Sequence, residues 1–447
     1  MAPRDRPRAI VFQLLRDVDE RAAYANLALP ALIAKARLDS RDAAFATELG
    51  YGTLRASGTL DEIVARCLDR PLAGVDAPVR DLLRLGAYQL LRTRVPAHAA
   101  LSSTVELARA SGNGRAAGFV NAVLRRIARQ DWDAWIAELD TGDAVADLAR
   151  RFCHPAWIAR AFEQALTAPD ELAAALAADD ERPQTHLVGW PGRVDRDRLA
   201  AQAGGRAGPY SPYAVRLSGG DPARLPAVAE HRAAVQDEGS QLCALALARV
   251  ELAGRDEYWL DLCAGPGGKS ALLAALAAPR GARLVANELH PHRAELVRRA
   301  TAGFPGVSVV TGDARLASAA ELHAPPDGFD RVLLDAPCTG LGALRRRPES
   351  RWRRGEADVP ALAGLQAELL RAALRLTRPG GVVGYVTCSP HPDETTARVA
   401  EYLDAHRAAG DTVPGFPADA QLGCGQAQLW PHRHGTDAMF CALLRKP

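Results

Sequence analysis

Two cysteines follow strand-like apolar runs in the last third of the chain, each in a loop that contains proline. Cys338 lies in Asp335-Ala336-Pro337-Cys338, and Cys388 lies in Thr387-Cys388-Ser389-Pro390. A cysteine thiolate is a nucleophile that can add to carbon 6 of a pyrimidine, which makes carbon 5 able to accept a methyl group. The adduct must then lose the carbon 5 proton and expel the thiolate. Two thiols at one edge of a nucleotide-binding type of sheet therefore predict covalent chemistry on a base.

Two further side chains supply what this addition needs. A nearby acid must hydrogen-bond ring nitrogen 3 of the base, and Asp335 is placed to do so. Lys269 can stabilise a thiolate or orient that acid. The chain holds 55 lysines and arginines, of which only three are lysine, so a lysine in a glycine loop departs from its own composition. We expect a catalytic group made of Cys388, Cys338, Asp335 and Lys269.

A glycine loop, Cys263 to Lys269, joins a predicted strand to a predicted helix. Glycines let the backbone approach a ligand closely, and the helix that follows presents free N–H groups. Glu288 ends the next strand, at a spacing that suits a carboxylate accepting from ribose hydroxyls. Asp313 ends the third strand, where an adenine edge would lie. Two acids at successive strand ends favour a nucleoside that carries a positive centre and no phosphate, which is S-adenosylmethionine.

Three other interpretations of the loop are weaker. Gly268-Lys269-Ser270 imitates the end of a phosphate-binding P-loop, but that motif needs glycine where Cys263 stands, and Glu288 and Asp313 would repel phosphates. A dinucleotide site needs G-x-G-x-x-G, which is not present. A structural turn would not explain the two acids. The residues expected to bind the cofactor are Cys263, Ala264, Gly265, Pro266, Gly267, Gly268, Lys269, Glu288, Asp313 and Asp335.

An arginine-rich stretch directly follows the Cys338 loop. A run of arginines is usually a solvated face, but this run contains an aromatic residue, a combination that suits RNA phosphates and an unstacked base. The residues expected to contact RNA are Arg345, Arg346, Arg347, Arg351 and Trp352.

Composition excludes several classes of protein. With 48% hydrophobic and 24% charged residues the chain has the composition of a soluble globular protein, and its net charge of +2 favours no particular partner. No apolar run approaches the roughly 20 residues that span a membrane, and no signal-peptide core follows the basic start. The eight cysteines form no Cys-x-x-Cys pair. We expect a cytoplasmic monomer with reduced thiols, no metal site and no membrane association. We expect a packing role for the remaining cysteines outside the loops, which are Cys67, Cys153, Cys243, Cys424 and Cys441.

The pattern of elements must position these side chains. Residues 4–130 show only helical periodicity, with helices expected at about 40–55, 78–91, 99–110 and 116–127. From residue 234 strands and helices alternate, which predicts a mostly parallel sheet with helices on both faces. The expected strands are 258–262, 283–287, 307–311, 329–334 and 382–387, and the expected helices are 268–278, 291–303, 360–377 and 393–407. Ligands of such sheets lie beyond the carboxyl ends of the strands, where the glycine loop and both thiol loops fall.

We therefore predict three domains and a multidomain fold class. Residues 1–135 form an all-α helical domain, 136–233 a small α+β module that contains a strand near 182–190, and 234–447 an α/β Rossmann-like catalytic domain.

The chain resembles the RNA 5-methylcytosine methyltransferases. The similar segments are the glycine loop, Asp335–Gly340, Thr387–Ser389, the tail Pro431–Asp437 and the segment Val235–Gln241. The N-terminal region resembles the NusB-type RNA-binding domain in Asp42–Arg55, Pro78–Leu91, Pro96–Ala99 and Gly118–Arg126. Together they resemble the ribosomal RNA small subunit methyltransferase B family. Glu288 stands where an aspartate is more common, and Leu187–Trp190 lacks the usual Arg-Val-Asn.

This resemblance implies an S-adenosylmethionine-dependent cytosine-5 methyltransferase of small-subunit ribosomal RNA. It implies that Cys388 is the nucleophile and that Cys338 assists product release, whereas DNA cytosine methyltransferases use the Pro-Cys thiol as nucleophile. Transfer RNA is the nearest alternative substrate. A non-catalytic RNA-binding assembly factor on the same fold is the alternative from another class, and a P-loop NTPase is a distant third.

Overall fold

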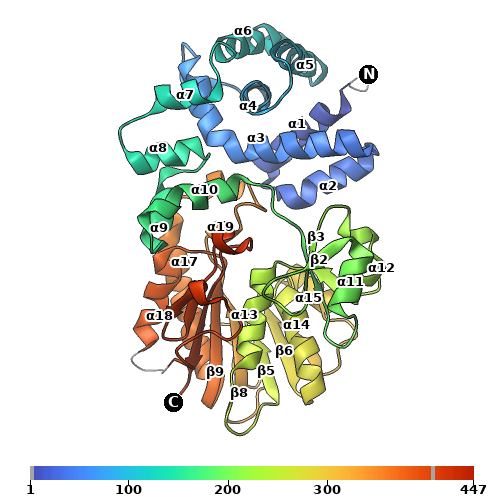
Figure 1. Ribbon diagram of the computed structural model, residues 1–447, viewed down its shortest axis with the longest axis vertical. Coiled ribbons are helices and arrows are strands. Elements are labelled where there is room, and N and C mark those ends of the chain that lie inside the picture. The colour runs from blue at the N-terminus through green and yellow to red at the C-terminus, as the bar shows by residue number, and fades with distance from the viewer. Residues whose placement is uncertain (1–4, 404–407) are drawn as a thin grey trace. The chain divides into compact units, whose positions relative to one another are not determined.

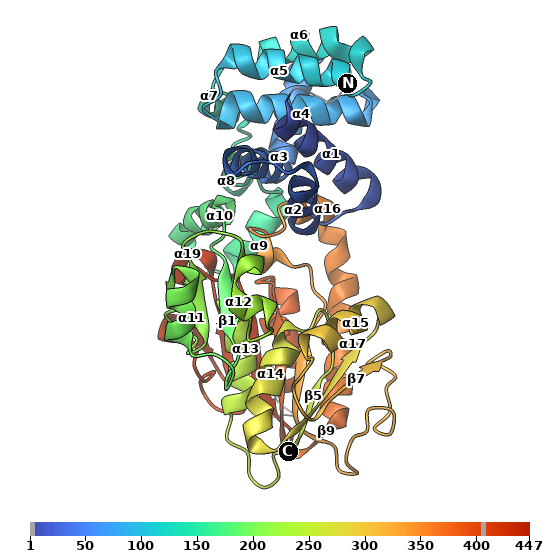
Figure 2. The same cartoon turned by 90° about the vertical axis from the view of Figure 1, so that its right-hand side faces the viewer.

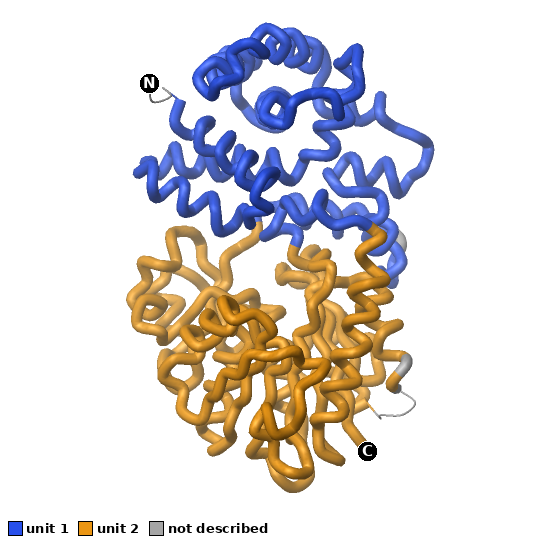
Figure 3. Tube along the Cα trace, turned by 180° about the vertical axis from the view of Figure 1, so that it is seen from behind, with its two compact units in different colours: residues 1–182, 344–355 blue, residues 183–343, 356–447 orange. Residues whose placement is uncertain are grey.

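The computed structural model describes residues 5–403 and 408–447 and divides into two compact units (Figures 1 and 3). The first unit comprises Met1–Arg182 and Leu344–Gly355, and the second comprises Pro183–Ala343 and Glu356–Pro447. These boundaries differ from the three predicted segments. Helices after residue 135 join the first unit because they extend its hydrophobic core, in which Cys153 packs in the same cluster as Leu60. The chain thus enters the first unit a second time, directly after the Cys338 loop.

The first unit is helical. Asp39 caps its longest helix by accepting a hydrogen bond from the Asp42 amide at 2.8 Å, as its position before a helical pattern predicts. Gly52 of that helix lets Tyr88 approach, because a Cβ there would lie 2.0 Å from the tyrosine ring. The helices of this unit are α1 Arg6–Arg21, α2 Ala25–Ala36, α3 Ser40–Arg66, α4 Ala77–Arg92, α5 Ala97–Ala110, α6 Ala117–Ile127, α7 Trp132–Leu139, α8 Ala144–Arg151, α9 Ala156–Ala165, α10 Leu172–Asp180 and α16 Ser350–Arg353.

The described part of the second unit contains two sheets. In the described residues the smaller sheet is antiparallel with the order β2-β3-β1-β4, and α11 (Arg196–Ala203) and α12 (Pro226–Ala229) pack on it. Its strands are β1 His186–Gly189, β2 Gly205–Ala207, β3 Ala214–Leu217 and β4 Ala233–Val235.

The larger sheet has the order β10-β11-β12-β9-β8-β5-β6-β7. Its strands β5 to β9 are parallel, and β10 to β12 are antiparallel. The strands are β5 Tyr258–Asp261, β6 Arg283–Glu288, β7 Val307–Thr311, β8 Phe329–Asp335, β9 Thr377–Thr387, β10 Gln421–Gly423, β11 Gln426–Gln428 and β12 Phe440–Arg445. The order reverses at β5, whose neighbours are β6 and β8. Ligands of such sheets bind at this reversal, beyond the carboxyl ends of the strands.

Helices cover both faces of the larger sheet (Figures 1 and 2). Helices α13 (Glu238–Arg249) and α14 (Gly268–Ala277) pack on one face with Trp259 and Leu333, and α15 (Pro291–Ala300) packs beside α14. Helices α17 (Val359–Leu376) and α18 (Thr396–Leu403) pack on the other face with Leu260 and Val332. Successive strand residues thus enter opposite cores, as the two-residue period of a strand requires.

The predicted fold class is confirmed: helices at the N-terminus, a small α+β sheet, and an α/β Rossmann-like domain. The five predicted strands of the larger sheet correspond to β5 to β9. The antiparallel strands β10 to β12 were not predicted. The last predicted helix, 393–407, begins as a 3-10 turn before α18, and its residues 404–407 lie outside the described residues. None of the helices described is long and apolar enough to cross a membrane.

Candidate active site

The two thiols of the predicted catalytic group lie side by side. Cys338 Sγ and Cys388 Sγ are 3.5 Å apart, and both residues are half-buried. Their loops follow β8 and β9, which pair in parallel with Asp335 opposite Val386. The carboxyl ends of neighbouring parallel strands meet at one edge of a sheet, so the two sulfur atoms lie together although the cysteines are 50 positions apart in sequence.

Lys269 and Asp335 form the charged part of this site. Lys269 Nζ donates to Asp335 Oδ2 at 2.8 Å, from the first turn of α14 to the last residue of β8. Burial alone would lower the pKa of Lys269, but the Asp335 carboxylate and neighbouring thiols raise it above the usual value. The lysine therefore stays an ammonium ion beside the acid. All four residues of the predicted catalytic group lie at the carboxyl ends of β5, β8 and β9.

A hydrogen bond joins the two sulfur atoms, and either thiol can be its donor. The contact with Cys388, followed by burial and the charge of Glu394, raises the pKa of the Cys338 thiol well above its usual value. The Cys338 thiol therefore keeps its proton while it contacts Cys388.

The glycine loop is fixed by the strand end beside it. Gly267 has φ of +109°, a backbone conformation that glycine adopts without strain, and it directly precedes α14. The Gly265 amide donates to Glu288 Oε2 at 3.0 Å. A Cβ at Gly265 would lie 2.2 Å from that same oxygen, so only glycine fits there.

The two predicted acids of the cofactor site differ in their surroundings. Glu288 is buried and also accepts from the His290 amide at 3.0 Å. Its two oxygens retain lone pairs beyond these two amides. Asp313 is partly exposed and forms a salt bridge with Arg315, with a shortest distance of 2.6 Å. A ligand at Asp313 would therefore share this carboxylate with Arg315.

Three polar residues of this edge were not predicted. Arg293 donates to the Gly265 carbonyl at 2.7 Å, and the Asn287 amide donates to the carbonyls of Leu262 and Gly312 at 3.1 Å each. Asp261 ends β5 and is buried. Burial raises its pKa to about 7, Ser270 Oγ donates to one oxygen at 2.6 Å, and its other oxygen has no hydrogen-bond partner. The position of Asp261 at a strand end, directly before the glycine loop, is the signal that could have identified it.

Two arginines of the stretch expected to contact RNA, Arg345 and Arg351, are buried. Arg351 is fully buried in the first unit, and its guanidinium donates to the carbonyls of Phe152, Cys153 and Asp179 at 3.2, 3.0 and 2.5 Å. It also pairs with Asp180 at 3.3 Å. A guanidinium with these partners holds the chain together and is not available to phosphates.

In the first unit Arg345 is buried and Trp352 is half-buried. Trp352 Nε1 donates to the Arg55 carbonyl at 2.9 Å, and a Cβ at Gly58 would lie 2.1 Å from the indole ring. Arg345 is 7% exposed. Arg347 is exposed and lies over the Tyr24 ring at 5.5 Å, while Arg346 is half-buried. Arg346, Arg347 and Trp352 therefore stay the candidates of the stretch for RNA contact.

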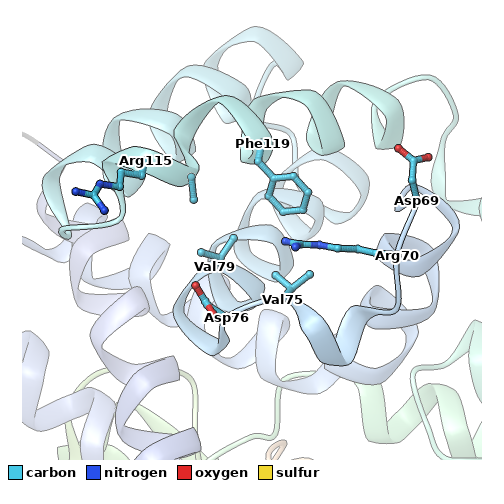
Figure 4. A pocket seen from close by; sticks show the side chains of 8 residues that line it. Asp69, Arg70, Val75, Asp76, Val79, Arg115 and Phe119 are labelled. Atoms are coloured by element: carbon cyan, nitrogen blue, oxygen red, sulfur yellow. The ribbon is translucent and has the colours of Figure 1, made fainter.

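A separate hollow of about 590 Å³ lies in the first unit (Figure 4). Arg70 lies over the Phe119 ring at 5.2 Å, and both acidic and basic side chains line the hollow. Its lining residues are Asp69, Arg70, Val75, Asp76, Val79, Arg115, Ala116 and Phe119. This mixed lining favours neither an anion nor a cation. Across 5–403 and 408–447 no cluster of three or more His, Cys, Asp or Glu side chains could hold a metal ion.

A parallel sheet that reverses at a glycine loop, with antiparallel β12 at its side and acids at its strand ends, defines a Rossmann-like methyltransferase domain. Residues 249–445 match the family model described as "16S rRNA methyltransferase RsmB/F", and residues 5–129 match that of the NusB family.

Curated relatives agree with these matches. A ribosomal RNA small subunit methyltransferase B from Salmonella newport is 33% identical over 98% of both chains. The Mycobacterium tuberculosis protein Rv1407 is 55% identical over 99% of this chain and 97% of its own. The chain belongs to the ribosomal RNA small subunit methyltransferase B family, with an N-terminal NusB domain.

A solved structure shows the same fold. The crystal structure of PH0851 aligns over 100% of both chains with a TM-score of 0.83 at 21% identity. NSun6 from Pyrococcus horikoshii, solved with SFG, aligns over 65% of this chain and 98% of its own with a TM-score of 0.55 at 18% identity.

Proposed function

We propose that this protein methylates carbon 5 of a cytosine in small-subunit ribosomal RNA, using S-adenosylmethionine, through a covalent bond between Cys388 and carbon 6. The observation that carries the proposal is the 3.5 Å separation of the Cys338 and Cys388 sulfur atoms beside the Lys269–Asp335 pair. A single thiol would suffice for nucleophilic attack. A second thiol in contact with the first suits a reaction that must also remove the carbon 5 proton, so that the bond between the first thiol and carbon 6 can break.

The residues around the glycine loop fit S-adenosylmethionine, which supplies the methyl group when bound. Glycine at 265 and 267 lets the loop pack against Glu288 and α15, and the Glu288 carboxylate retains acceptor capacity for ribose hydroxyls. The buried Asp261 oxygen without a partner lies at the same strand end as the loop. NSun6, a structure of similar fold, contains SFG, an analogue of this cofactor. The ten cofactor-binding residues predicted from sequence, Cys263 to Lys269 with Glu288, Asp313 and Asp335, remain our proposal for this site.

The proposed sequence of bonds assigns a separate role to each thiol. The Cys388 thiolate bonds to carbon 6, and the electron pair of the 5,6 double bond makes carbon 5 the nucleophile that receives the methyl group. That methyl group would come from the sulfonium centre of the bound cofactor, whose sulfur would keep the bonding electrons as a neutral thioether. A proton shared between Asp335 and ring nitrogen 3, which carries no hydrogen in cytosine, would hold the base and offset the negative charge that the addition brings to the ring. A base then takes the carbon 5 proton, the double bond forms again, and the Cys388 thiolate leaves.

Cys338 becomes a better base once Cys388 has reacted. In the free enzyme the hydrogen bond with Cys388 is the largest cause of the raised Cys338 pKa. Once the Cys388 sulfur is bonded to carbon 6 it carries no charge and no longer attracts the Cys338 proton. This cause of the raised Cys338 pKa is then lost, while burial and the charge of Glu394 remain. Removal of the carbon 5 proton by Cys338 is therefore easier after the attack by Cys388 than before it.

The experiment combines methyl transfer from labelled S-adenosylmethionine with bisulfite sequencing of ribosomal RNA from a deletion strain. The proposal predicts one 5-methylcytosine of small-subunit RNA that disappears on deletion and is restored by the gene. If only transfer RNA were methylated, transfer RNA would be the substrate in place of ribosomal RNA. An absence of methyl transfer to either RNA would favour a non-catalytic assembly factor.

A further inference from the structure

Glu394 is a fully buried acid that belongs to neither the predicted catalytic group nor the predicted cofactor site. It lies in a 3-10 turn (Pro392–Glu394) shortly after the Cys388 loop. Its Oε1 accepts from the Thr339 amide at 2.8 Å, and its Oε2 accepts from Thr339 Oγ1. A carboxylate whose two oxygens both accept hydrogen bonds from one residue fixes the position and orientation of that residue.

Thr339 and its contacts connect the two thiol loops. Thr339 directly follows Cys338, and its hydroxyl lies 3.2 Å from Ser389 Oγ, which directly follows Cys388. The chain of contacts Glu394–Thr339–Ser389 therefore joins the residues next to both thiols. All three side chains are buried, so water does not compete for these hydrogen bonds.

The other partners of Glu394 hold the same region. Gln366 of α17 donates to Glu394 Oε1 at 3.1 Å and to the Pro337 carbonyl at 2.9 Å, on the other side of Cys338. Tyr385 Oη donates to the Glu394 carbonyl at 2.8 Å. Cys338 is thus fixed through both of its neighbours, Pro337 and Thr339, and each fixing contact leads to Glu394 or Gln366.

We propose that Glu394 is a positioning residue for product release, which holds the Cys338 loop at the Cys388 loop so that Cys338 reaches the methylated base. This inference rests on the proposed function, because it concerns the step assigned there to Cys338. Glu394 acts on the position of the thiol through Thr339. Its negative charge also contributes to the raised pKa of Cys338, together with the Cys388 sulfur.

The test uses the full chain with Glu394→Gln and Glu394→Asp, and with Asp393→Asn as a matched control at the exposed neighbouring acid. We expect Glu394→Gln to bind S-adenosylmethionine within about twofold of wild type, because Glu288 and the glycine loop are untouched. Misplacing a reacting group by about 1 Å can cost on the order of 100-fold, so we expect kcat to fall roughly 10- to 100-fold with little change in the KM for RNA. Covalent enzyme–RNA complex should accumulate on denaturing gels. Glu394→Asp should be intermediate and Asp393→Asn normal.

Two further variants keep the result decisive. Thr339→Val removes the hydroxyl contacts but keeps the backbone and the shape, so it should trap RNA as well, and it replaces Glu394→Gln if that protein does not fold. Cys338→Ala tests the thiol mechanism by itself. If Cys338→Ala traps RNA while Glu394→Gln and Thr339→Val release product at the wild-type rate, the inference about Glu394 is overturned and the proposed function stands. If Cys338→Ala traps no RNA, the assignment of release to Cys338 fails, and the inference fails with it.

Discussion

Replacing Arg351 with alanine should destabilise the first unit without changing how the protein responds to salt when it binds RNA. The Arg351 guanidinium is fully buried, donates to three backbone carbonyls and pairs with Asp180. Removing one partner of a buried, hydrogen-bonded pair typically costs about 3–5 kcal/mol. Three carbonyls would also lose a charged donor, so we expect a loss of stability in the upper part of that range.

The assay is native-state hydrogen exchange of amides in α9 and α10, the helices that flank the Arg351 contacts. A destabilisation of about 3–5 kcal/mol would speed the exchange of protected amides by roughly two to four orders of magnitude. Exchange is preferable to a single melting temperature because two compact units need not unfold together. Arg347→Ala is the control, because Arg347 is exposed and its contact with Tyr24 should contribute less than about 1 kcal/mol.

A single result would refute this reasoning. If Arg351→Ala left exchange in α9 and α10 unchanged but flattened the salt dependence of RNA binding, the arginine would be a phosphate contact. Its burial and its hydrogen bonds to backbone carbonyls would then not represent its role in solution.

Three other changes have defined outcomes. Glu288→Ala should raise the Kd for S-adenosylmethionine roughly tenfold or more, since hydrogen bonds to charged groups contribute about 1.5–3 kcal/mol; unchanged affinity in calorimetry would mean that the cofactor lies elsewhere. Replacing both Arg346 and Arg347 with alanine should reduce the log–log salt slope of RNA binding by roughly 0.7 for each phosphate that is no longer neutralised, and an identical slope would make them a solvated face. Asp261 has a pKa raised by burial from 3.8 to about 7, so its charge disfavours the folded state increasingly between about pH 4 and 7. Asp261→Asn should therefore be more stable than wild type at pH 8, by up to about 4 kcal/mol, and equal to it near pH 4; a difference independent of pH in denaturant titrations would contradict this.

Local sequence patterns were sufficient to predict the strands that carry the site. Apolar runs ending in Glu288, Asp335 and Thr387 predicted strands, and the parallel order follows from the alternation of strands and helices. Residues at the ends of neighbouring parallel strands must meet, so the proximity of Cys338 and Cys388 could be expected from the sequence alone. The short strands β10 and β11 have three residues each, too few to show the alternation that identifies a strand.

The sequence could not predict the distant hydrogen-bond partners of Arg351 and Glu394. Arg351 resembles a surface arginine in its local context, and the carbonyls that it binds belong to residues almost 200 positions earlier. The same limit applies to Glu394, whose partner Thr339 is 55 positions away. A buried charge and an exposed charge have the same local sequence, and only the fold determines which acceptors surround each.

The most direct test of the account is the covalent state of the two thiol variants after incubation with S-adenosylmethionine and ribosomal RNA. Cys338→Ala should accumulate an RNase-sensitive, slower-migrating band on a denaturing gel, because Cys388 still attacks but is not released. Cys388→Ala and the double variant should show no band and no methylation. If Cys388→Ala were the variant that trapped RNA, the roles of the two thiols would be reversed, and if neither trapped RNA while both stayed active, the reaction would not pass through a cysteine adduct.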